Sequence, residues 1–365
     1  MKNDTLLVVF GTRPEAIKLM PLIKVLRSSS KFTIKICVSA QHRQMLDSVL
    51  SEYGIIPDYD LDVMRSEQSL DYLTSAILNK TGELLDTLKP RAIIVHGDTT
   101  TAFSAALAAF YRQISVIHIE AGLRSKNILS PHPEEFNRRA ISMIADHHFA
   151  PTQSAADNLI AEGISGDKIF TVGNTAIDTL LYNLECSAPE DIGVESDKRT
   201  ILITLHRREH SELEFAEIFE AIRTLCLRRE NIRAIYPLHK NPKIREIAKR
   251  YFDKIPNLEL CEPLCTKEFH RLLAKAYMVL TDSGGIQEEA AFLGKPTLVL
   301  RDVTERSEGI GHSLILAGTH RQNIIDTAER LLSDTAEYKR HSMPTNVFGD
   351  GHTSKRICDI LQKLL

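Results

Sequence analysis

The segment from Thr281 to Glu289, with the sequence TDSGGIQEE, contains residue types that can bind a nucleotide. It follows a short apolar run, and Gly284 and Gly285 would let backbone N–H groups converge on an anion where a helix begins. Glu289, one helical turn later, could accept hydrogen bonds from a ribose. A diphosphate and a sugar hydroxyl would then be bound together, which predicts a nucleotide site. Ser-Gly-Gly by itself is more typical of a plain turn between a strand and a helix, and the rest of the chain decides against that interpretation.

Carboxylates gather at the ends of other apolar runs. Asp98 in HGDTTT and Glu120 in EAGLRS each follow a predicted strand, and Glu134 in PEEFNR offers a third acid. Acids that face one another in a cleft acquire different pKa values, which gives one proton donor and one acceptor. In the alternative interpretation, Asp98 caps a helix and Glu120 pairs with Arg124. That alternative accounts poorly for three acids at strand ends.

Basic and polar residues occupy similar positions. Arg13 and Lys18 in GTRPEAIK flank a predicted helix start, where phosphate or sugar hydroxyls can bind. The segment lacks the G-x-G-x-x-G pattern, which disfavours a dinucleotide cofactor. His206 ends another strand and could bind a diphosphate or protonate it as it leaves. The run Gln41-His42-Arg43-Gln44 is either a helix cap or a second polar site.

The elements that must position these residues are strands alternating with amphipathic helices. Short apolar runs predict strands at Leu6–Phe10, Thr33–Val38, Ala92–Val95, Val116–Ile119, His148–Ala150, Ile169–Val172, Thr200–Thr204, Ile232–Tyr236, Leu258–Leu260, Met278–Leu280 and Thr297–Leu300. This alternation indicates α/β domains with doubly wound parallel sheets. Such sheets bind ligands at the carboxyl ends of their strands, so we expect the active site in a cleft between two domains.

Length and composition agree with two globular domains. A chain of 365 residues is too long for a single core, and 43% hydrophobic with 25% charged residues is typical of a soluble protein. We expect a first domain at 1–182, a polar linker at 183–198, a second domain at 199–352 that holds the predicted nucleotide site, and a C-terminal helix, 353–365, that packs back on the first domain.

Net charge, the length of the apolar runs and the cysteine spacing limit the partners and the cellular location that we expect. A net charge of -3 gives no basic surface for nucleic acid, and no apolar run approaches the roughly 20 residues of a membrane span. The polar start before Leu6 indicates a first strand rather than a signal peptide. Six scattered cysteines without zinc-site spacing indicate free thiols, so we expect a cytoplasmic protein.

Taken together, the motifs resemble those of the non-hydrolysing UDP-N-acetylglucosamine 2-epimerases. The matching series, in order from Phe10 to the last helix, is GTRPEAIK, QHRQMLD, HGDTTT, EAGLRS, PEEFNR, TLHRRE, PLHKNP, DSGGIQEEA, LGKP, TER and GDG. The resemblance implies two Rossmann-like domains of glycosyltransferase-B type, no metal or NAD cofactor, and a cytoplasmic homodimer. It also implies reversible conversion of UDP-GlcNAc to UDP-ManNAc by elimination and re-addition of UDP through 2-acetamidoglucal, feeding surface polysaccharide synthesis.

The resemblance assigns roles position by position. The acid–base carboxylates are Asp98, Glu120 and Glu134, and His206 stabilises departing UDP. The residues implied to bind the substrate are Arg13, Lys18, Arg138, Phe269, Ser283, Gly284, Gly285, Glu289 and Arg306. Those implied to bind a second UDP-GlcNAc as an allosteric activator are Gln41, His42, Gln44, Arg207 and His239. The positions that depart from the usual pattern, none of them a charged site residue, are His132, His210, Leu264 and Ser307.

The same residues suggest three alternative functions. A hydrolysing epimerase would release UDP and free ManNAc, but the context of Pro14, Glu15 and Lys18 favours the non-hydrolysing branch. A glycosyltransferase of the same architecture would not need three carboxylates. A non-catalytic sugar-nucleotide sensor would be expected to lack some of these acids, and all of them are present.

Overall fold

The chain folds into two α/β units. The computed structural model describes residues 4–41, 43–65, 68–186, 197–205, 211–238 and 242–365. One unit comprises Met1–Thr179 with Gly349–Leu365, and the other comprises Leu180–Phe348. The chain therefore leaves the first unit within helix α7 (Thr175–Glu185) and returns after Phe348. The centre of the expected linker, 187–196, lies outside the described residues.

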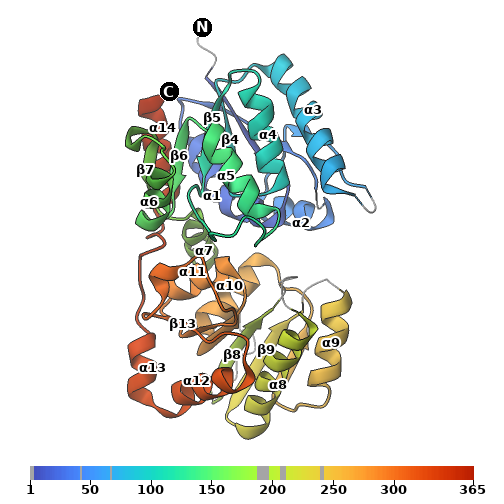
Figure 1. Ribbon diagram of the computed structural model, residues 1–365, viewed down its shortest axis with the longest axis vertical. Coiled ribbons are helices and arrows are strands. Elements are labelled where there is room, and N and C mark those ends of the chain that lie inside the picture. The colour runs from blue at the N-terminus through green and yellow to red at the C-terminus, as the bar shows by residue number, and fades with distance from the viewer. Residues whose placement is uncertain (1–3, 42, 66–67, 187–196, 206–210, 239–241) are drawn as a thin grey trace. The chain divides into compact units, whose positions relative to one another are not determined.

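The first unit is built on a parallel sheet. Among its described residues the strand order is β3-β2-β1-β4-β5-β6-β7, and each neighbouring pair is parallel (Figure 1). The strands are β1 Thr5–Phe10, β2 Thr33–Val38, β3 Tyr59–Asp60, β4 Ala92–His96, β5 Ser115–Ile119, β6 His147–Ala150 and β7 Ile169–Thr171. The order reverses between β1 and β4, which is where doubly wound sheets bind ligands.

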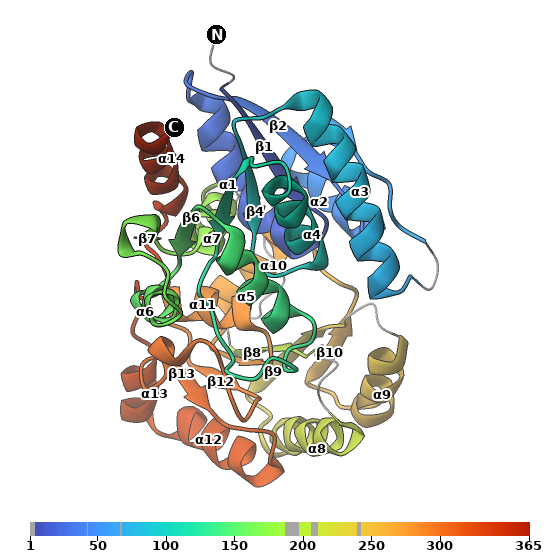
Figure 2. The ribbon, with the colours of Figure 1, turned by 45° about the horizontal axis from the view of Figure 1, so that its top comes forward.

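Helices cover both faces of this sheet. They are α1 Arg13–Ser28, α2 Arg43–Tyr53, α3 Leu70–Leu88, α4 Thr100–Phe110, α5 Glu134–Ile144, α6 Gln153–Ala161, the short 3₁₀ helix η1 Gly166–Lys168, the first part of α7, and α14 Thr353–Leu364. Helices α3, α4 and α5 pack side by side on one face, while α1 packs with α2 and α14 (Figure 2). Gln362 of α14 donates to the Ser29 hydroxyl at 2.9 Å, which ties the end of the chain to α1.

The central strands are apolar because they are covered from both sides. Every residue from Leu6 to Phe10 in β1 is fully buried, as expected for a parallel strand between two helical layers. Alanines dominate the buried side of α4, so this helix approaches the sheet closely. Helix α1 begins with a capping box, in which Thr12 and Glu15 bond to each other's backbone N–H groups, and with a proline in its first turn.

The second unit repeats this design around its own sheet. Its described strands follow the order β10-β9-β8-β11-β12-β13, all parallel, and the order reverses between β8 and β11. The strands are β8 Arg199–Thr204, β9 Ile232–Pro237, β10 Leu258–Cys261, β11 Met278–Thr281, β12 Thr297–Val299 and β13 Leu314–Leu316. The helices are α8 Glu212–Arg228, α9 Pro242–Phe252, α10 Thr266–Lys275, α11 Gly284–Phe292, the 3₁₀ helix η2 Ser307–Gly309, α12 Arg321–Ser333 and α13 Thr335–His341. Phe219, Tyr236 and Phe252 pack together at its core, with Tyr236 edge-to-face against both phenylalanines and the two phenylalanine rings tilted.

The sheets confirm the predicted fold class. Each predicted strand is present, with ends shifted by a residue at most, and two further strands, β3 and β13, extend the sheet edges. In the described parts of the chain, the helices are too short or too polar to cross a membrane.

Candidate active site

The reversal point of the first sheet brings the turn after β1 next to the turn after β4. Gly11 is needed in the first turn, because a Cβ atom there would lie 2.1 Å from the Ser39 hydroxyl and 2.3 Å from that of Thr101. The Glu15 carboxylate links the turns. Its Oε2 accepts from the Thr12 backbone N–H at 2.8 Å, and its Oε1 accepts from the Thr99 hydroxyl at 2.8 Å.

Glu15 is a titratable group beneath both turns. It is 3% exposed, and burial raises its pKa from 4.5 to about 7, although the hydrogen bonds from Thr12, Gly11 and Thr99 favour the ionised form. The carboxylate therefore changes charge near neutral pH while holding the start of α1, and hence the positions of Arg13 and Lys18.

Asp98 lies just beyond β4 and is held by α5. The guanidinium of Arg138 forms an ion pair with its carboxylate, with 3.1 Å between Nε and Oδ2. The Asp98 carbonyl accepts from the Asn137 amide at 2.9 Å. Arg138 is itself held at 3.1 Å by Glu135, which is fully buried and also accepts from Arg139 at 2.9 Å. Asp98 is therefore fixed on two sides by one helix.

Glu120 lies directly after β5 and is held from two other directions. Its carboxylate forms an ion pair with Lys18 and accepts from the Asn174 amide at 2.6 Å. Its backbone has a φ of 62°, in the left-handed region that non-glycine residues rarely adopt. A Cβ atom at Gly97, the residue before Asp98, would be 3.6 Å from Oε1 of Glu120.

The structure brings two of the three predicted acids to one sheet edge and places the third on a helix. His96 of β4 aligns with Ile119 of β5, so Asp98 and Glu120 emerge side by side. Glu134 is not at a strand end; it is half-buried and is the first residue of α5. It starts the same helix that holds Asp98 through Arg138.

Both parts of the alternative interpretation are wrong. The residue that caps α4 is Thr99, whose hydroxyl accepts from the Ala102 N–H, and not Asp98. Arg124 pairs with Glu162 at 2.7 Å, and Glu120 pairs with Lys18 instead. We expected the acids to face one another. In the structure Asp98 and Glu120 each contact a cation instead, and the two cations come from different helices.

Buried histidines lie beneath this edge. Burial lowers the pKa of His96 to about 4, that of His118 to about 3 and that of His148 to about 4, so all three are neutral at physiological pH. Nε2 of His118 lies 2.7 Å from the Gly97 carbonyl and donates to it, which supports the turn that leads to Asp98.

The reversal point of the second sheet carries the Ser-Gly-Gly turn. Ser283 is the N-cap of α11, and Gly284 and Gly285 are its first two residues. A Cβ atom on Gly284 would lie 2.6 Å from the guanidinium carbon of Arg306, whereas one on Gly285 would meet no atom of the described residues within 4 Å. Arg306 is buried and bonds to the Glu288 carboxylate at 2.9 Å. Among the described residues, the N-terminus of α11 is therefore open beside Gly285, and the Arg306 guanidinium packs against Gly284.

Two further predicted residues flank this turn. Glu289 is 7% exposed and lies in α11, and Phe269 is half-buried in α10, where it packs against a cluster containing Leu272 and Leu273. His206, which would act on the diphosphate, lies outside the described residues.

The predicted activator residues are described only in part. The Gln41 side chain accepts from the Thr101 hydroxyl at 3.0 Å, which connects it to the start of α4. His42, Arg207 and His239 lie outside the described residues, as does the side chain of Gln44.

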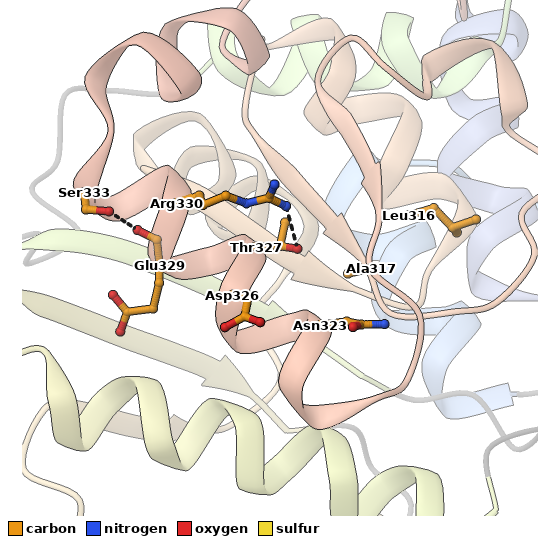
Figure 3. Close-up of a pocket in the computed structure, with 8 residues that line it drawn as sticks. All are labelled: Leu316, Ala317, Asn323, Asp326, Thr327, Glu329, Arg330 and Ser333. Carbon is orange, nitrogen blue, oxygen red and sulfur yellow. Dashed lines mark hydrogen bonds between the residues drawn. The ribbon is translucent and has the colours of Figure 1, made fainter.

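A pocket elsewhere in the second unit involves none of the predicted residues. It is open and lies along α12 beside β13 (Figure 3), and the residues that line it are Leu316, Ala317, Asn323, Asp326, Thr327, Glu329, Arg330 and Ser333. Arg330 donates to Thr327 at 3.4 Å within this lining.

Comparisons with known proteins match the chain over nearly its whole length. The profile of the family described as UDP-N-acetylglucosamine 2-epimerase matches residues 24–362. A UDP-N-acetylglucosamine 2-epimerase of Bacillus subtilis strain 168 is 48% identical over 99% of this chain and 96% of its own. The chain belongs to the UDP-N-acetylglucosamine 2-epimerase family.

Solved structures of family members agree with the fold. The UDP-GlcNAc 2-epimerase of Neisseria meningitidis, bound to UDP-GlcNAc, has a TM-score of 0.95 at 42% identity, over 98% of this chain and 100% of its own. The enzyme of Methanocaldococcus jannaschii, in complex with UDP-GlcNAc and UDP, has a TM-score of 0.86 at 34% identity, over 98% of this chain and 99% of its own.

Sequence reasoning assigned no role in the candidate site to three residues that the structure places there, Glu15, Asn174 and Glu135. Glu15 is the last residue of a Thr-x-x-Glu capping pattern. This pattern predicts a helix start, but it does not predict the hydrogen bond from Thr99. Asn174 follows β7 and could have been found by the strand-end rule that found Glu120. Nothing local distinguishes buried Glu135 from its neighbour Glu134.

Proposed function

We propose that this protein interconverts UDP-GlcNAc and UDP-ManNAc by elimination and re-addition of UDP, without hydrolysis. The observation that carries the proposal is the pair of carboxylates, Asp98 and Glu120, at adjacent strand ends, each held by a cation. The left-handed backbone of Glu120 supports it, because such strain costs about 1–3 kcal/mol and is concentrated at functional sites.

The chemistry explains why several acids are needed. The C2–H bond of an N-acetylhexosamine is too weakly acidic for direct deprotonation. When the C1–O bond to UDP breaks, positive character at C1 acidifies C2–H, a carboxylate takes the proton, and the C2–H electron pair forms the C1=C2 bond of 2-acetamidoglucal. An acid then returns a proton to the opposite face of C2, and UDP adds again to C1. We assign the proton transfers to Asp98, Glu120 and Glu134.

The second unit would hold the leaving group. Backbone N–H groups at Gly284 and Gly285 open α11, where a helix N-terminus favours a diphosphate, and the Arg306 guanidinium, held by Glu288, packs behind the turn. Phe269 would lie near the uracil and Glu289 at the ribose. Arg13, Lys18 and Arg138 would contact the sugar and phosphates, and His206 would stabilise departing UDP.

Membership of the family also suggests how the enzyme is used. We propose a cytoplasmic homodimer that supplies UDP-ManNAc for surface polysaccharide synthesis and needs neither metal nor NAD. We also propose that a second UDP-GlcNAc activates it through Gln41, His42, Gln44, Arg207 and His239, the first of which bonds to the start of α4.

Product analysis tests this proposal. Purified protein incubated with UDP-GlcNAc should yield UDP-ManNAc up to a fixed equilibrium ratio, measured by ¹H NMR. Release of free ManNAc in step with UDP would establish the hydrolysing reaction instead.

Substitutions test the assigned acids. Asp98→Asn, Glu120→Gln and Glu134→Gln should each lower kcat by about 100-fold or more, because each removes a proton-transfer group, with UDP binding kept. Glu162→Gln is the control, since that acid of the first unit pairs with Arg124. A near-normal rate in any of the three variants would remove that residue from the mechanism.

A further inference from the structure

A buried histidine lies behind Glu289. His270 of α10 is 2% exposed, and its Nε2 lies 3.5 Å from Oε2 of Glu289. On the other side of the ring, Nδ1 lies 2.9 Å from the amide nitrogen of Asn183 in α7. Three buried side chains from three helices of the second unit therefore form a row that ends at the proposed ribose ligand.

The amide fixes the tautomer of the imidazole. An amide N–H can only donate, so Nδ1 of His270 accepts and carries no proton, and the ring N–H is on Nε2, facing Glu289. The reverse orientation of the Asn183 amide would place the proton on Nδ1. In a neutral ring it would leave two acceptors, Nε2 and the carboxylate oxygen, facing each other at 3.5 Å, and in a protonated ring Nε2–H would still face Glu289.

The carboxylate needs that donor. Among the residues that the structure describes, Oε2 of Glu289 is buried without a hydrogen-bond partner, a state that costs free energy in a folded protein. At 3.5 Å the Nε2–H group of His270 is slightly too distant for a full hydrogen bond, and a small rotation of the glutamate would form one. Oε2 is buried, so the 7% exposure of Glu289 lies on its other atoms, and we infer that a ligand would approach through Oε1.

We propose that His270 is a positioning residue, whose Nε2–H group holds the Glu289 carboxylate so that it accepts hydrogen bonds from the ribose hydroxyls of a uridine nucleotide. The inference rests on the proposed function, which makes the nucleotide the ligand of Glu289. It gives the protein a specific property: preference for ribonucleotides over deoxyribonucleotides depends on a residue that does not touch the ligand.

Isothermal titration with UDP, 2′-deoxy-UDP and 3′-deoxy-UDP tests the proposal. Wild-type protein should bind at least one deoxy analogue about tenfold or more weakly than UDP, as expected for the loss of a hydrogen bond to a charged group. His270→Leu should weaken UDP binding by a similar factor but leave binding of that analogue nearly unchanged. His270→Gln keeps a neutral N–H donor and should retain most of the affinity for UDP.

A matched control is available in α13. His341 is also buried, and its Nε2 lies 3.5 Å from Oε1 of Glu337, but neither residue belongs to the proposed nucleotide site. His341→Leu should therefore leave the preference for UDP over its deoxy analogues unchanged. In turnover, His270→Leu should raise KM for UDP-GlcNAc with little change in kcat, because the lost interaction holds substrate and transition state alike.

The outcomes separate this inference from the proposed function. Equal weakening of UDP and both analogues in His270→Leu would mean a structural role and would overturn the inference, as would wild-type affinity in that variant. Wild-type protein that binds UDP and both analogues equally would overturn it without any variant. An active epimerase with either result keeps the proposed function, whereas wild-type protein that binds no UDP overturns both.

Discussion

Replacing Glu15 by glutamine should change how the stability of this protein depends on pH. The Glu15 carboxyl has a pKa of about 7 in the folded state against 4.5 when unfolded, because burial disfavours its charge. Between these values the folded chain holds a proton that the unfolded chain has lost. The free energy of unfolding contributed by Glu15 is therefore complete below about pH 4.5 and is lost as pH rises through about 7.

The size of the effect follows from the two pKa values. A difference of about 2.5 units corresponds to about 3.4 kcal/mol at roughly 1.36 kcal/mol per unit, and about 2.5 kcal/mol of this falls between pH 5 and pH 8. The buried histidines act in the opposite direction. His96, His118 and His148 are neutral when folded, so their contribution is lost as pH falls below about 6.5.

The comparison of wild type with Glu15→Gln isolates the glutamate, because the histidines are common to both proteins. Urea unfolding followed by circular dichroism at pH 5 and pH 8 gives both free energies. The free energy of unfolding of wild type minus that of the variant should be larger at pH 5 than at pH 8 by about 2.5 kcal/mol. The contribution of any hydrogen bonds lost in the variant is present at both pH values and cancels. Glu83→Gln, on an exposed part of α3, is the control and should follow wild type. Parallel pH profiles for wild type and Glu15→Gln would refute the reasoning.

Glycine substitutions make further predictions. Gly284→Ala should both destabilise the second unit and weaken UDP binding by about tenfold or more, because the methyl group would lie 2.6 Å from the Arg306 guanidinium. Gly285→Ala meets no atom, so urea unfolding should show stability unchanged or raised by up to about 1 kcal/mol, yet titration should still show weaker UDP binding, because the methyl group enters the proposed diphosphate space. Gly122→Ala should lower Tm markedly, since φ is 89° and the new Cβ would lie 2.1 Å from the Ala155 carbonyl; an unchanged Tm would contradict the backbone described here.

The fold was predictable from the sequence because its strands are buried on both faces. A strand such as Leu6–Phe10 is a continuous apolar run, and such runs can be recognised without knowing their neighbours. The two strands that were missed lie at the sheet edges and are short, and only the second of them is apolar. Tyr59–Asp60 is two residues long and partly exposed, and Leu314–Leu316 is a three-residue edge strand that follows a loop.

The site was predictable as a set of residue types but not as a set of contacts. The strand-end rule correctly brings Asp98 and Glu120 to one edge, because the order of parallel strands follows from topology. Which side chains form ion pairs depends on the tertiary structure. Arg124 is near Glu120 in the sequence, but the cation that pairs with Glu120 is Lys18, at a separation of 102 residues. Likewise, the bond from Thr99 to Glu15 exists only because β1 and β4 are neighbours in the sheet.

Isotope exchange at C2 tests the central claim, that carboxylates of this protein move a proton at that carbon while UDP is detached. Wild-type protein is incubated with UDP-GlcNAc in D₂O without added cofactor, and the sugar is followed by ¹H NMR. If these carboxylates move the proton, UDP-ManNAc should carry deuterium at C2 as it forms, and Asp98→Asn and Glu120→Gln should suppress this exchange. Formation of UDP-ManNAc that retains its original hydrogen at C2 would contradict this claim.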